Sequence, residues 1–419
     1  MNTDAPTADG NRERRGRTGG PRAAGSEPMR RPVLATALLT VGLIASPGAV
    51  YAQTPCPERL DTELLEARLD DFAEIADHTV LLEVRNGDDT WSEAIGPRSL
   101  EEEAREARPD DRVRVGSLTK SMTAVMILQL QREGEIDLDD RIGEHLPGLL
   151  PYEEDPTIRQ VLNHTGGLPD FLPHLYPSLA EGDLSDVREG HRTRYEPEEL
   201  IAIGTQGPLL FEPGTGWSYS NVGYFVLGLL VEEVTGNSFG HELEARILGP
   251  AGLERSYFPR GGSGIRGPHP VPYVTTGESD EPYFDTTKLS STQLWAAGGV
   301  VSTTADLNDF YGALTDGTLL TESELAEATD YVATGGSSQY GLGLFGRRFD
   351  CPHDPEQVFF GHDGDALGHE TWSFHSMDGE RRITVAWNIG DKHGYADPEA
   401  FDAALEALLA AGLCGAPRE

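Results

Sequence analysis

The stretch VGSLTKSMTAVMILQLQ, residues 115–131, places a serine and a lysine at the start of an apolar helix. Ser117 and Lys120 are three residues apart, a spacing that puts two side chains on one face of a helix. Lys supplies only three of the 33 basic residues, Lys120, Lys288 and Lys392, and Arg supplies the other 30. Arg keeps its proton at any working pH, whereas a desolvated Lys can release it. The stretch therefore predicts a serine nucleophile beside a lysine that can accept its proton.

The composition of the whole chain limits the classes of partner. The 419 residues are 38% hydrophobic, enough for one large domain or two closely packed ones. The formal net charge of −37 repels nucleic acid and anionic membranes, so we expect neither as a partner. We interpret this charge as an adaptation for solubility in a salty medium.

The first 52 residues have the order of a secretory signal peptide. Seven Arg come first, an apolar run over 33–45 follows, and small residues close the segment. The apolar run is too short and too interrupted for a stable membrane span. Arg30-Arg31 leaves twin-arginine export open beside general secretion. We therefore expect a secreted, extracellular protein made of residues 53–419.

The cysteines are few. Cys56, Cys351 and Cys414 remain after the predicted cleavage, and in an exported protein they predict one disulfide and one free thiol. The residues alone leave all three pairings open. No CxxC pair and no Cys/His cluster occurs in the sequence, which argues against a zinc site.

Hydrophobic periodicity predicts a mixed α+β order of elements. The expected helices are 57–76, 117–132, 218–235, 239–248, 304–314 and 398–411. The expected strands are 78–84 and 90–96, joined as a hairpin at Asn86-Gly87, and later 339–345, 356–361, 369–376 and 381–389.

The simplest assembly of these elements has two lobes. The N-terminal hairpin pairs with the C-terminal strands in one antiparallel sheet flanked by the terminal helices. This sheet lobe would span about 57–116 and 295–415, and an all-helical lobe would span about 117–294. A cleft between the lobes would hold the site.

Two further motifs are weak when taken alone. Tyr219-Ser220-Asn221 opens the second apolar helix, where the tyrosine could relay a proton or could simply pack in the core. His362-Asp363-Gly364 lies at a predicted strand edge, where a glycine lets a substrate backbone approach closely, although such a triplet is usually a turn.

The order of the three motifs is more specific than any one of them. About a hundred residues separate Ser117 from Tyr219, and about 140 separate Tyr219 from His362. With RVGSLTKSM, TIRQVLNHTGGLPDF and EPGTGWSYSNVGYFVLGLLVEEVTG, the chain resembles the serine penicillin-recognising enzymes, the class C β-lactamases and D-alanyl-D-alanine carboxypeptidases. It resembles most the secreted carboxypeptidases, whose third motif begins with His. The resemblance covers 113–415 and implies a β-lactamase/DD-peptidase-like α+β fold.

The resemblance also implies a mechanism. Ser117 would attack a carbonyl and form an acyl-enzyme. Either Lys120, or Tyr219 as a phenolate, would take the serine proton, and Tyr219 would protonate the leaving group. Asn221 would orient Lys120 and the substrate amide, and His362 would lie beside Tyr219. No cofactor and no metal is needed.

The resemblance implies further binding residues. The backbone N–H groups of Ser117 and of Asp365, which follows Gly364, would form the oxyanion hole. Trp295 would line the cleft or pack in the core, and His164 is expected to be structural. The implied disulfide joins Cys351 to Cys414 and leaves Cys56 free. We expect a monomer that accepts peptide or other acyl substrates and β-lactam inhibitors.

The chain departs from the carboxypeptidase pattern where a substrate carboxylate would bind. Asp363 and Asp365 stand where hydroxyls are expected, with Arg347 and Arg348 as the nearby cations. Two ionised carboxylates would repel a free carboxylate unless an Arg compensates or Asp363 is protonated or turned away. We name a D-Ala-D-Ala carboxypeptidase first. An esterase, an amidase or D-aminopeptidase and a β-lactamase are alternatives, and a non-catalytic binding homologue is a remote one.

Overall fold

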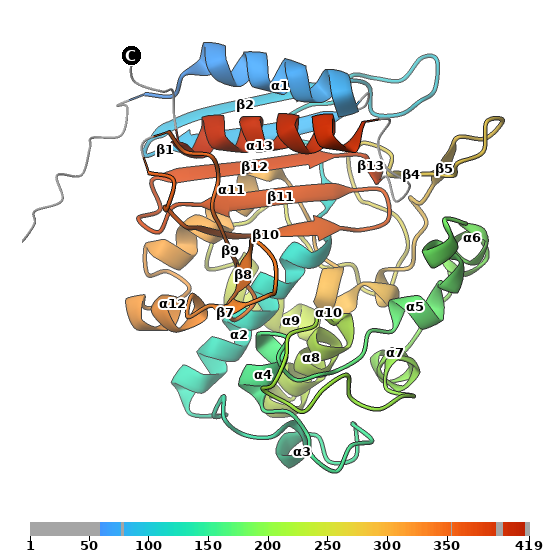
Figure 1. The fold of residues 1–419 in the computed structure, drawn as a ribbon, viewed down its shortest axis with the longest axis vertical. Coiled ribbons are helices and arrows are strands. Elements are labelled where there is room, and N and C mark those ends of the chain that lie inside the picture. Colours follow the sequence, from blue (N-terminus) through green and yellow to red (C-terminus); the bar gives the residue numbers. More distant parts are fainter. Residues whose placement is uncertain (1–58, 77–78, 353, 391–396, 415–419) are drawn as a thin grey trace, which may run out of the picture. The chain divides into compact units, whose positions relative to one another are not determined.

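The computed structural model describes residues 59–76, 79–352, 354–390 and 397–414 (Figure 1). The predicted signal peptide and Cys56 lie outside these ranges. Within them, no helix combines the length and the hydropathy that crossing a membrane requires.

An antiparallel sheet forms the centre of the fold (Figure 1). Its eight strands are β1 (Val80–Asn86), β2 (Asp89–Ile95), β7 (Val332–Ala333), β8 (Gln339–Tyr340), β9 (Phe345–Arg347), β10 (Phe359–Asp365), β11 (Glu370–His375) and β12 (Arg381–Trp387). They lie in the order β2-β1-β12-β11-β10-β9-β8-β7. The N-terminal hairpin therefore pairs with the C-terminal strand β12, as predicted. This arrangement confirms the α+β fold class.

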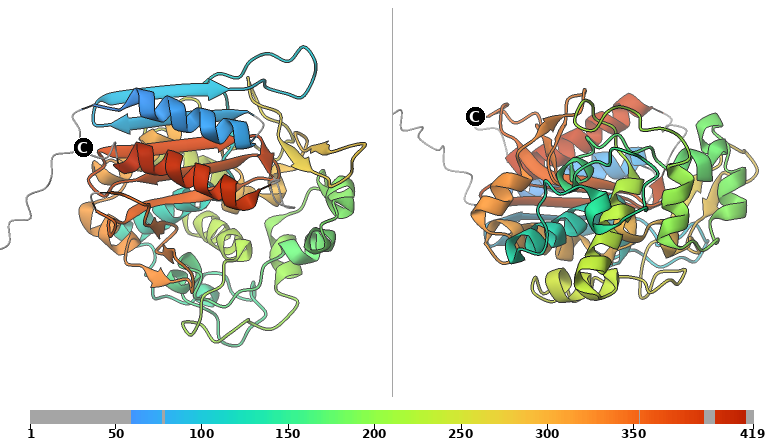
Figure 2. Two further views of the ribbon diagram at one scale, coloured as in Figure 1. Left: turned by 45° about the horizontal axis from the view of Figure 1, so that its top comes forward. Right: turned by 90° about the horizontal axis from the view of Figure 1, so that it is seen from below.

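Helices cover both faces of the sheet (Figure 2). α1 (Thr62–Ala76) and α13 (Pro398–Cys414) pack together on one face, and α11 (Thr304–Thr315) contacts the other. Along β1, Val80 and Leu82 join the core beneath α1 and α13, whereas Leu81 joins the helical core. Because both faces are buried here, residues 80–82 form a continuous apolar run rather than an alternating one.

Two short strands, β3 (Val113–Arg114) and β6 (Val301–Ser302), pair with each other. Most of the remaining helices come between these two strands in the sequence. They are α2 (Thr119–Glu133), α3 (Ile142–His145), α4 (Ile158–Leu162), α5 (Leu172–Leu175), α6 (Ser185–Gly190), α7 (Pro197–Gly204), α8 (Asn221–Thr235), α9 (Phe239–Leu243) and α10 (Trp295–Gly298), with α12 (Glu322–Ala328) following later. A small sheet joins β13 (Ile389–Gly390), β4 (Tyr273–Thr275) and β5 (Tyr283–Asp285). The buried helices α2, α8 and α10 contact one another.

Two predicted helices begin later in the structure than the sequence pattern indicated. The helix expected from 117 starts with a short 3-10 turn, Gly116–Leu118, before α2. The helix expected from 218 starts only at Asn221, because the backbone of Ser220 is extended. Ser117 and Tyr219 therefore lie just before the α-helices α2 and α8, not within them.

Two predicted strands also have different limits. The strand expected over 339–345 is divided into β8 and β9, and Gly343 between them has a φ of 73° that other residues rarely adopt. β10 extends through Asp365, four residues beyond the predicted end at 361. His362 and Gly364 therefore lie inside a strand rather than in a turn.

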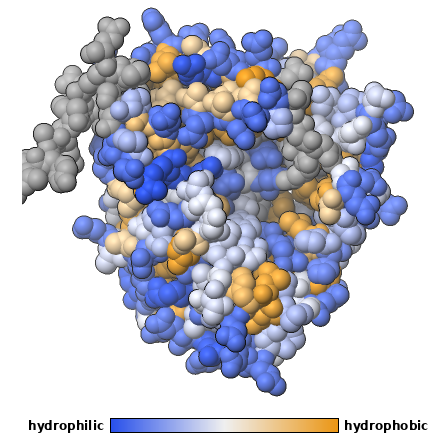
Figure 3. All heavy atoms as spheres, viewed as in Figure 1, coloured by the Kyte–Doolittle hydropathy of each residue, from blue (hydrophilic) through white to orange (hydrophobic). Residues whose placement is uncertain are grey.

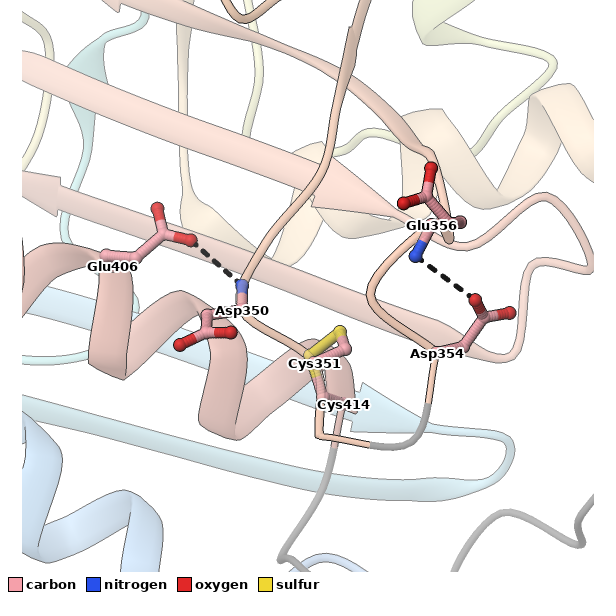
Figure 4. The surroundings of a disulfide bond; sticks show 6 residues. All are labelled: Asp350, Cys351, Asp354, Glu356, Glu406 and Cys414. Atoms are coloured by element: carbon pink, nitrogen blue, oxygen red, sulfur yellow. Dashed lines mark hydrogen bonds between the residues drawn. A yellow bond between two sulfur atoms is a disulfide. The ribbon is translucent and has the colours of Figure 1, made fainter.

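A disulfide joins Cys351, in the loop between β9 and β10, to Cys414 at the end of α13 (Figure 4). This is the pairing that the resemblance implied. The two Cα atoms are 5.2 Å apart, and 63 residues separate them in sequence. The bond ties the strand that carries the third motif to the last helix.

We predict that the double variant Cys351→Ser/Cys414→Ser unfolds more easily than the native protein. Opening a loop of this length raises the entropy of the unfolded chain and costs about 2–4 kcal/mol of unfolding free energy. Urea denaturation measures this loss. Cys56→Ser is the matched control and should leave the midpoint unchanged, and an unchanged midpoint in the double variant would contradict the prediction.

Candidate active site

Ser117 lies where the helical region meets the sheet. It follows Gly116, whose φ of 54° falls in the left-handed region, and it remains half-buried rather than sealed. A side chain on Gly116 would come within 2.7 Å of the backbone nitrogen of Asp365. A side chain on Gly364 would come within 2.9 Å of the backbone nitrogen of Ser117. The two glycines therefore let the turn at Ser117 lie directly against β10.

Lys120 is the central polar contact of this junction. Its side chain is fully buried, and its Nζ lies 3.0 Å from Ser117 Oγ. The same nitrogen donates to Asn221 Oδ1 at 2.8 Å and to the carbonyl oxygen of Ala297 at 3.0 Å. It also lies over the ring of Tyr219, 4.7 Å from the ring centroid. Lys120, near the start of α2, thus contacts the turn before α2, the helices α8 and α10, and the segment before α8.

Burial makes this lysine a usable base near neutral pH. Loss of solvation lowers the pKa of Lys120 to about 7, and the negative charges of Asp170 and Asp363 partly oppose this shift. A large fraction of Lys120 is therefore unprotonated at pH 7. An uncharged amine 3.0 Å from Ser117 Oγ can accept the hydroxyl proton.

Asp170 was not predicted from the sequence as a site residue. Its carboxylate accepts hydrogen bonds from the backbone N–H of Asn221 at 2.8 Å and from Asn221 Nδ2 at 2.9 Å. These bonds fix the amide so that its oxygen faces Lys120. Asp170 lies in the LPDF stretch, which was part of the resemblance, but a residue 51 positions from its partner gave no local signal.

Tyr219 lies on the extended segment just before α8. Burial raises the pKa of Tyr219 well above its ordinary value, and its side chain interacts with that of Ser117. The Ser117 contact lowers that pKa only in part, and the charge of Asp363 raises it further. The phenol is therefore strongly disfavoured as a phenolate, whereas Lys120 is poised to lose its proton.

His362 pairs with a tyrosine other than the one predicted. Its Nδ1 donates to the carbonyl oxygen of Asp363 at 2.5 Å, so its Nε2 accepts from the hydroxyl of Tyr340 at 2.9 Å. The rings of His362 and Tyr219 are 6.4 Å apart between centroids. Burial lowers the pKa of His362 to about 3, so the ring is neutral at working pH. The sequence did not predict Tyr340 as a site residue, because it reaches His362 only through the pairing of β8 with β9 and of β9 with β10.

The two acids after His362 behave differently. Asp365 Oδ1 accepts the backbone N–H of Leu367 at 2.7 Å, within the turn after β10. Burial raises the pKa of the Asp363 carboxyl, and the positive charge of Arg347 opposes this. Arg347 also stacks on Trp372, 4.4 Å from the ring centroid.

Arg348 points elsewhere. Its Nε donates to the backbone carbonyl of Glu356 at 3.4 Å, and half of its side chain is exposed. Of the two candidate cations, Arg347 is therefore the one that acts on Asp363.

Trp295 packs against the helical core and stays partly exposed. Its ring packs against Phe225 and Phe239, each 5.4 Å away between centroids. These contacts agree with the packing role, one of the two predicted for Trp295, and the other role, lining the cleft, stays a prediction. The neighbouring backbone of α10 reaches the site through Ala297.

The face that carries β10 is hollowed near its middle, over the region where Figure 1 places β10 and α10 (Figure 3). Ser117, Tyr219 and Asn221 each keep part of their surface exposed, whereas Lys120 does not. Within the described ranges, no three His, Cys, Asp or Glu side chains gather as they would around a metal ion.

Comparison with known proteins agrees with this geometry. A model of the Beta-lactamase family matches residues 72–408. This chain belongs to the beta-lactamase family. It is accordingly a serine hydrolase of the group that contains the β-lactamases and penicillin-binding proteins.

The relatives of this family member carry several names. Penicillin-binding protein 4* of Bacillus subtilis (strain 168) is 26% identical over 341 residues, which cover 78% of this chain and 71% of that protein. Esterase EstB of Burkholderia gladioli is 31% identical over 214 residues, which cover 48% of this chain and only 53% of the esterase. The relatives therefore include more than one type of activity.

Solved structures show the same variety. A D-stereospecific amidohydrolase from Streptomyces sp. matches with a TM-score of 0.72 at 29% identity, covering 84% of this chain and 99% of that one. A penicillin-binding protein from Bacillus halodurans matches with a TM-score of 0.66 at 22% identity, covering 82% and 98%. The second likeness concerns the fold alone.

We predict that Gly364→Ala impairs the hydrolase through the contact between β10 and Ser117. The added methyl group would press on the backbone of Val115 and Ser117, so the strand or the nucleophile must shift. Overpacking of this kind costs about 1–3 kcal/mol of unfolding free energy. We also expect kcat/KM to fall at least about 10-fold, because small displacements of a nucleophile are costly.

Gly207→Ala is the matched control for this variant. A side chain at Gly207 meets no atom within 4 Å, so its activity and stability should stay native. If Gly364→Ala kept native kcat/KM and native stability, the close approach of the two backbones would not matter to the enzyme.

We predict that Asp170→Asn moves the acidic limb of the pH–rate profile to lower pH. Asp170 raises the pKa of Lys120, so removing its charge lowers that pKa below about 7. The limb is read from log(kcat/KM) between pH 4 and 9. Asp70→Asn, an exposed substitution on α1, serves as control and should not move the midpoint. A shift to higher pH would contradict Lys120 as the titrating group.

Proposed function

We propose that this hydrolase cleaves amide bonds in amino-acid amides or short peptides that carry a free, positively charged amino group. In this reading it is an amidase or aminopeptidase for D-amino acids rather than a carboxypeptidase. The observation that carries the proposal is the carboxyl of Asp363, next to His362 in β10 and within electrostatic reach of Lys120 and Tyr219.

The charge balance around Ser117 supports this choice. Asp170 and Asp363 both act on Lys120, which carries only part of its positive charge at pH 7 because its pKa is about 7. The opposing cation at Asp363 is Arg347, which is also held by stacking on Trp372. A carboxylate about 4 Å from an ionised acid costs about 4 kcal/mol at an effective dielectric near 20, whereas an ammonium gains a similar amount.

The relatives support the amide bond and the D configuration. The Streptomyces D-stereospecific amidohydrolase matches over almost its whole length at 29% identity. The name describes the Streptomyces protein, and a preference for D substrates in this chain is part of our proposal.

The chemistry follows from the roles available to each side chain. Lys120 takes the proton of Ser117 as the hydroxyl oxygen attacks the carbonyl, since the phenolate of Tyr219 is strongly disfavoured. The backbone N–H groups of Ser117 and Asp365 receive the developing oxyanion. Tyr219 gives its hydroxyl proton to the leaving amine and regains one from the protonated Lys120, so no phenolate is left, and Asn221 binds the substrate amide. Water then attacks the acyl carbonyl and gives a proton to Lys120, which passes it to Ser117 Oγ as the ester bond breaks and the acid leaves.

A D-Ala-D-Ala carboxypeptidase is the second candidate. Arg347 is the observation in its favour, because a guanidinium near Asp363 could receive a terminal carboxylate. Penicillin-binding protein 4* among the relatives supports the same reading.

Two matched pairs of substrates test the proposal. D-alanyl-p-nitroanilide should be cleaved at least about 10-fold better in kcat/KM than its N-acetyl derivative, which lacks the charged amine. N-acetyl-D-Ala-D-Ala amide should be cleaved better than the corresponding free acid. L-alanyl-p-nitroanilide measures the stereochemical preference.

Variants separate the electrostatic effect from the chemistry. Ser117→Ala should abolish every activity. Asp363→Asn should reduce the preference for the charged amine while retaining turnover, because the hydrogen-bonding shape is kept and the charge is lost. A clear preference for the acetylated free acid would instead establish the carboxypeptidase.

A further inference from the structure

His164 is a buried histidine that the proposed reaction does not use. It lies in the turn after α4, and its φ of 62° is in the left-handed region. A residue other than glycine is uncommon there and stays only where its surroundings fix it. Only 3% of the residue is exposed. Such outliers gather at functional sites.

The contacts of His164 surround Tyr219. Its backbone carbonyl accepts the N–H of Ser218 at 3.1 Å, and its ring Nδ1 accepts the N–H of Ser220 at 3.2 Å. The ring itself lies 4.3 Å from the ring of Tyr219 between centroids. One residue therefore holds the backbone on both sides of the tyrosine and packs on its side chain.

The protonation of the ring follows from these bonds. Because Nδ1 accepts from a backbone N–H, the proton of the neutral ring is on Nε2. This Nε2 is buried without a hydrogen-bond partner among the described residues. Burial lowers the pKa of His164 well below its ordinary value, with smaller contributions from Lys120 and His362. An apolar side chain would avoid the unpaired donor, so simple packing does not account for a histidine here.

We propose that His164 is a positioning residue for Tyr219. It holds residues 218–220 extended up to the first residue of α8, so that the Tyr219 hydroxyl reaches Ser117 while Asn221 starts the helix. This inference rests on the proposed function, because it needs Tyr219 to move a proton in the reaction. It adds a role in the reaction to the structural role expected of His164 from the sequence.

A double-mutant cycle with Tyr219→Phe tests this role. His164→Phe keeps an aromatic ring but removes the acceptor, so we expect kcat to fall about 10- to 100-fold with KM nearly unchanged. In the Tyr219→Phe background the same substitution should cause little further loss, because a misplaced phenol cannot matter once the phenol is gone. Activity is measured per folded protein on the best substrate of the native enzyme.

Rescue by a conservative variant provides the second measurement. In His164→Asn the side-chain oxygen stands near the position of Nδ1, and Asn tolerates a positive φ. We expect this variant to recover kcat to within about 3-fold of native, since small shifts in the acceptor remain. If His164→Phe does not fold, His164→Gly takes its place in the cycle, because glycine adopts this φ without strain.

Additive losses in the cycle would overturn the inference, since His164 would then act on the whole site rather than on Tyr219. Failure of His164→Asn to recover kcat would overturn the role of the acceptor. Full activity of Tyr219→Phe would also overturn the inference, because the reaction would then not need the Tyr219 hydroxyl that His164 is proposed to position. None of these results alters the substrate preference, so the proposed function and the inference fail separately.

Discussion

A buried lysine is the constraint on which the site depends. Lys120 has no exposed surface, and removing an ammonium from water is expensive unless it is paired or loses its proton. The structure provides acceptors at Asn221 and Ala297 and negative charge at Asp170, yet its pKa still falls to about 7. The lysine is thereby held between its two protonation states. Arg could not replace it, because its guanidinium would keep the proton.

The fold around Lys120 brings together segments that are far apart in the sequence. Ser117 precedes α2, Asn221 starts α8, and β10 comes from the C-terminal part of the chain. The sheet can meet the helical region at Ser117 only because Gly116 and Gly364 carry no side chains there. The disulfide between Cys351 and Cys414 anchors the approach to β10 from the other side (Figure 4). Rigid elements thus fix a site whose residues lie at the starts of α2 and α8 and within β10.

The two acids of β10 have different surroundings. Asp363 and Asp365 share one strand, but the turn after β10 engages Asp365 through Leu367. Asp363 is left as the acid whose charge reaches Lys120 and Tyr219, with Arg347 as its counterpart. The relatives include penicillin-binding proteins, an esterase and an amidohydrolase.

The sequence by itself determined the class of fold and predicted Ser117 and Lys120 as reacting groups. Apolar periodicity located the terminal helices, the hairpin and the C-terminal strands, because burial leaves a pattern within one element. The spacing of Ser117 and Lys120 was also local. Tertiary structure alone paired Tyr340 with His362 and Asp170 with Asn221, across 22 and 51 residues. It also selected Arg347 over Arg348, because strand register decides which side chain faces Asp363. Such contacts depend on how elements pack, and no local pattern records that.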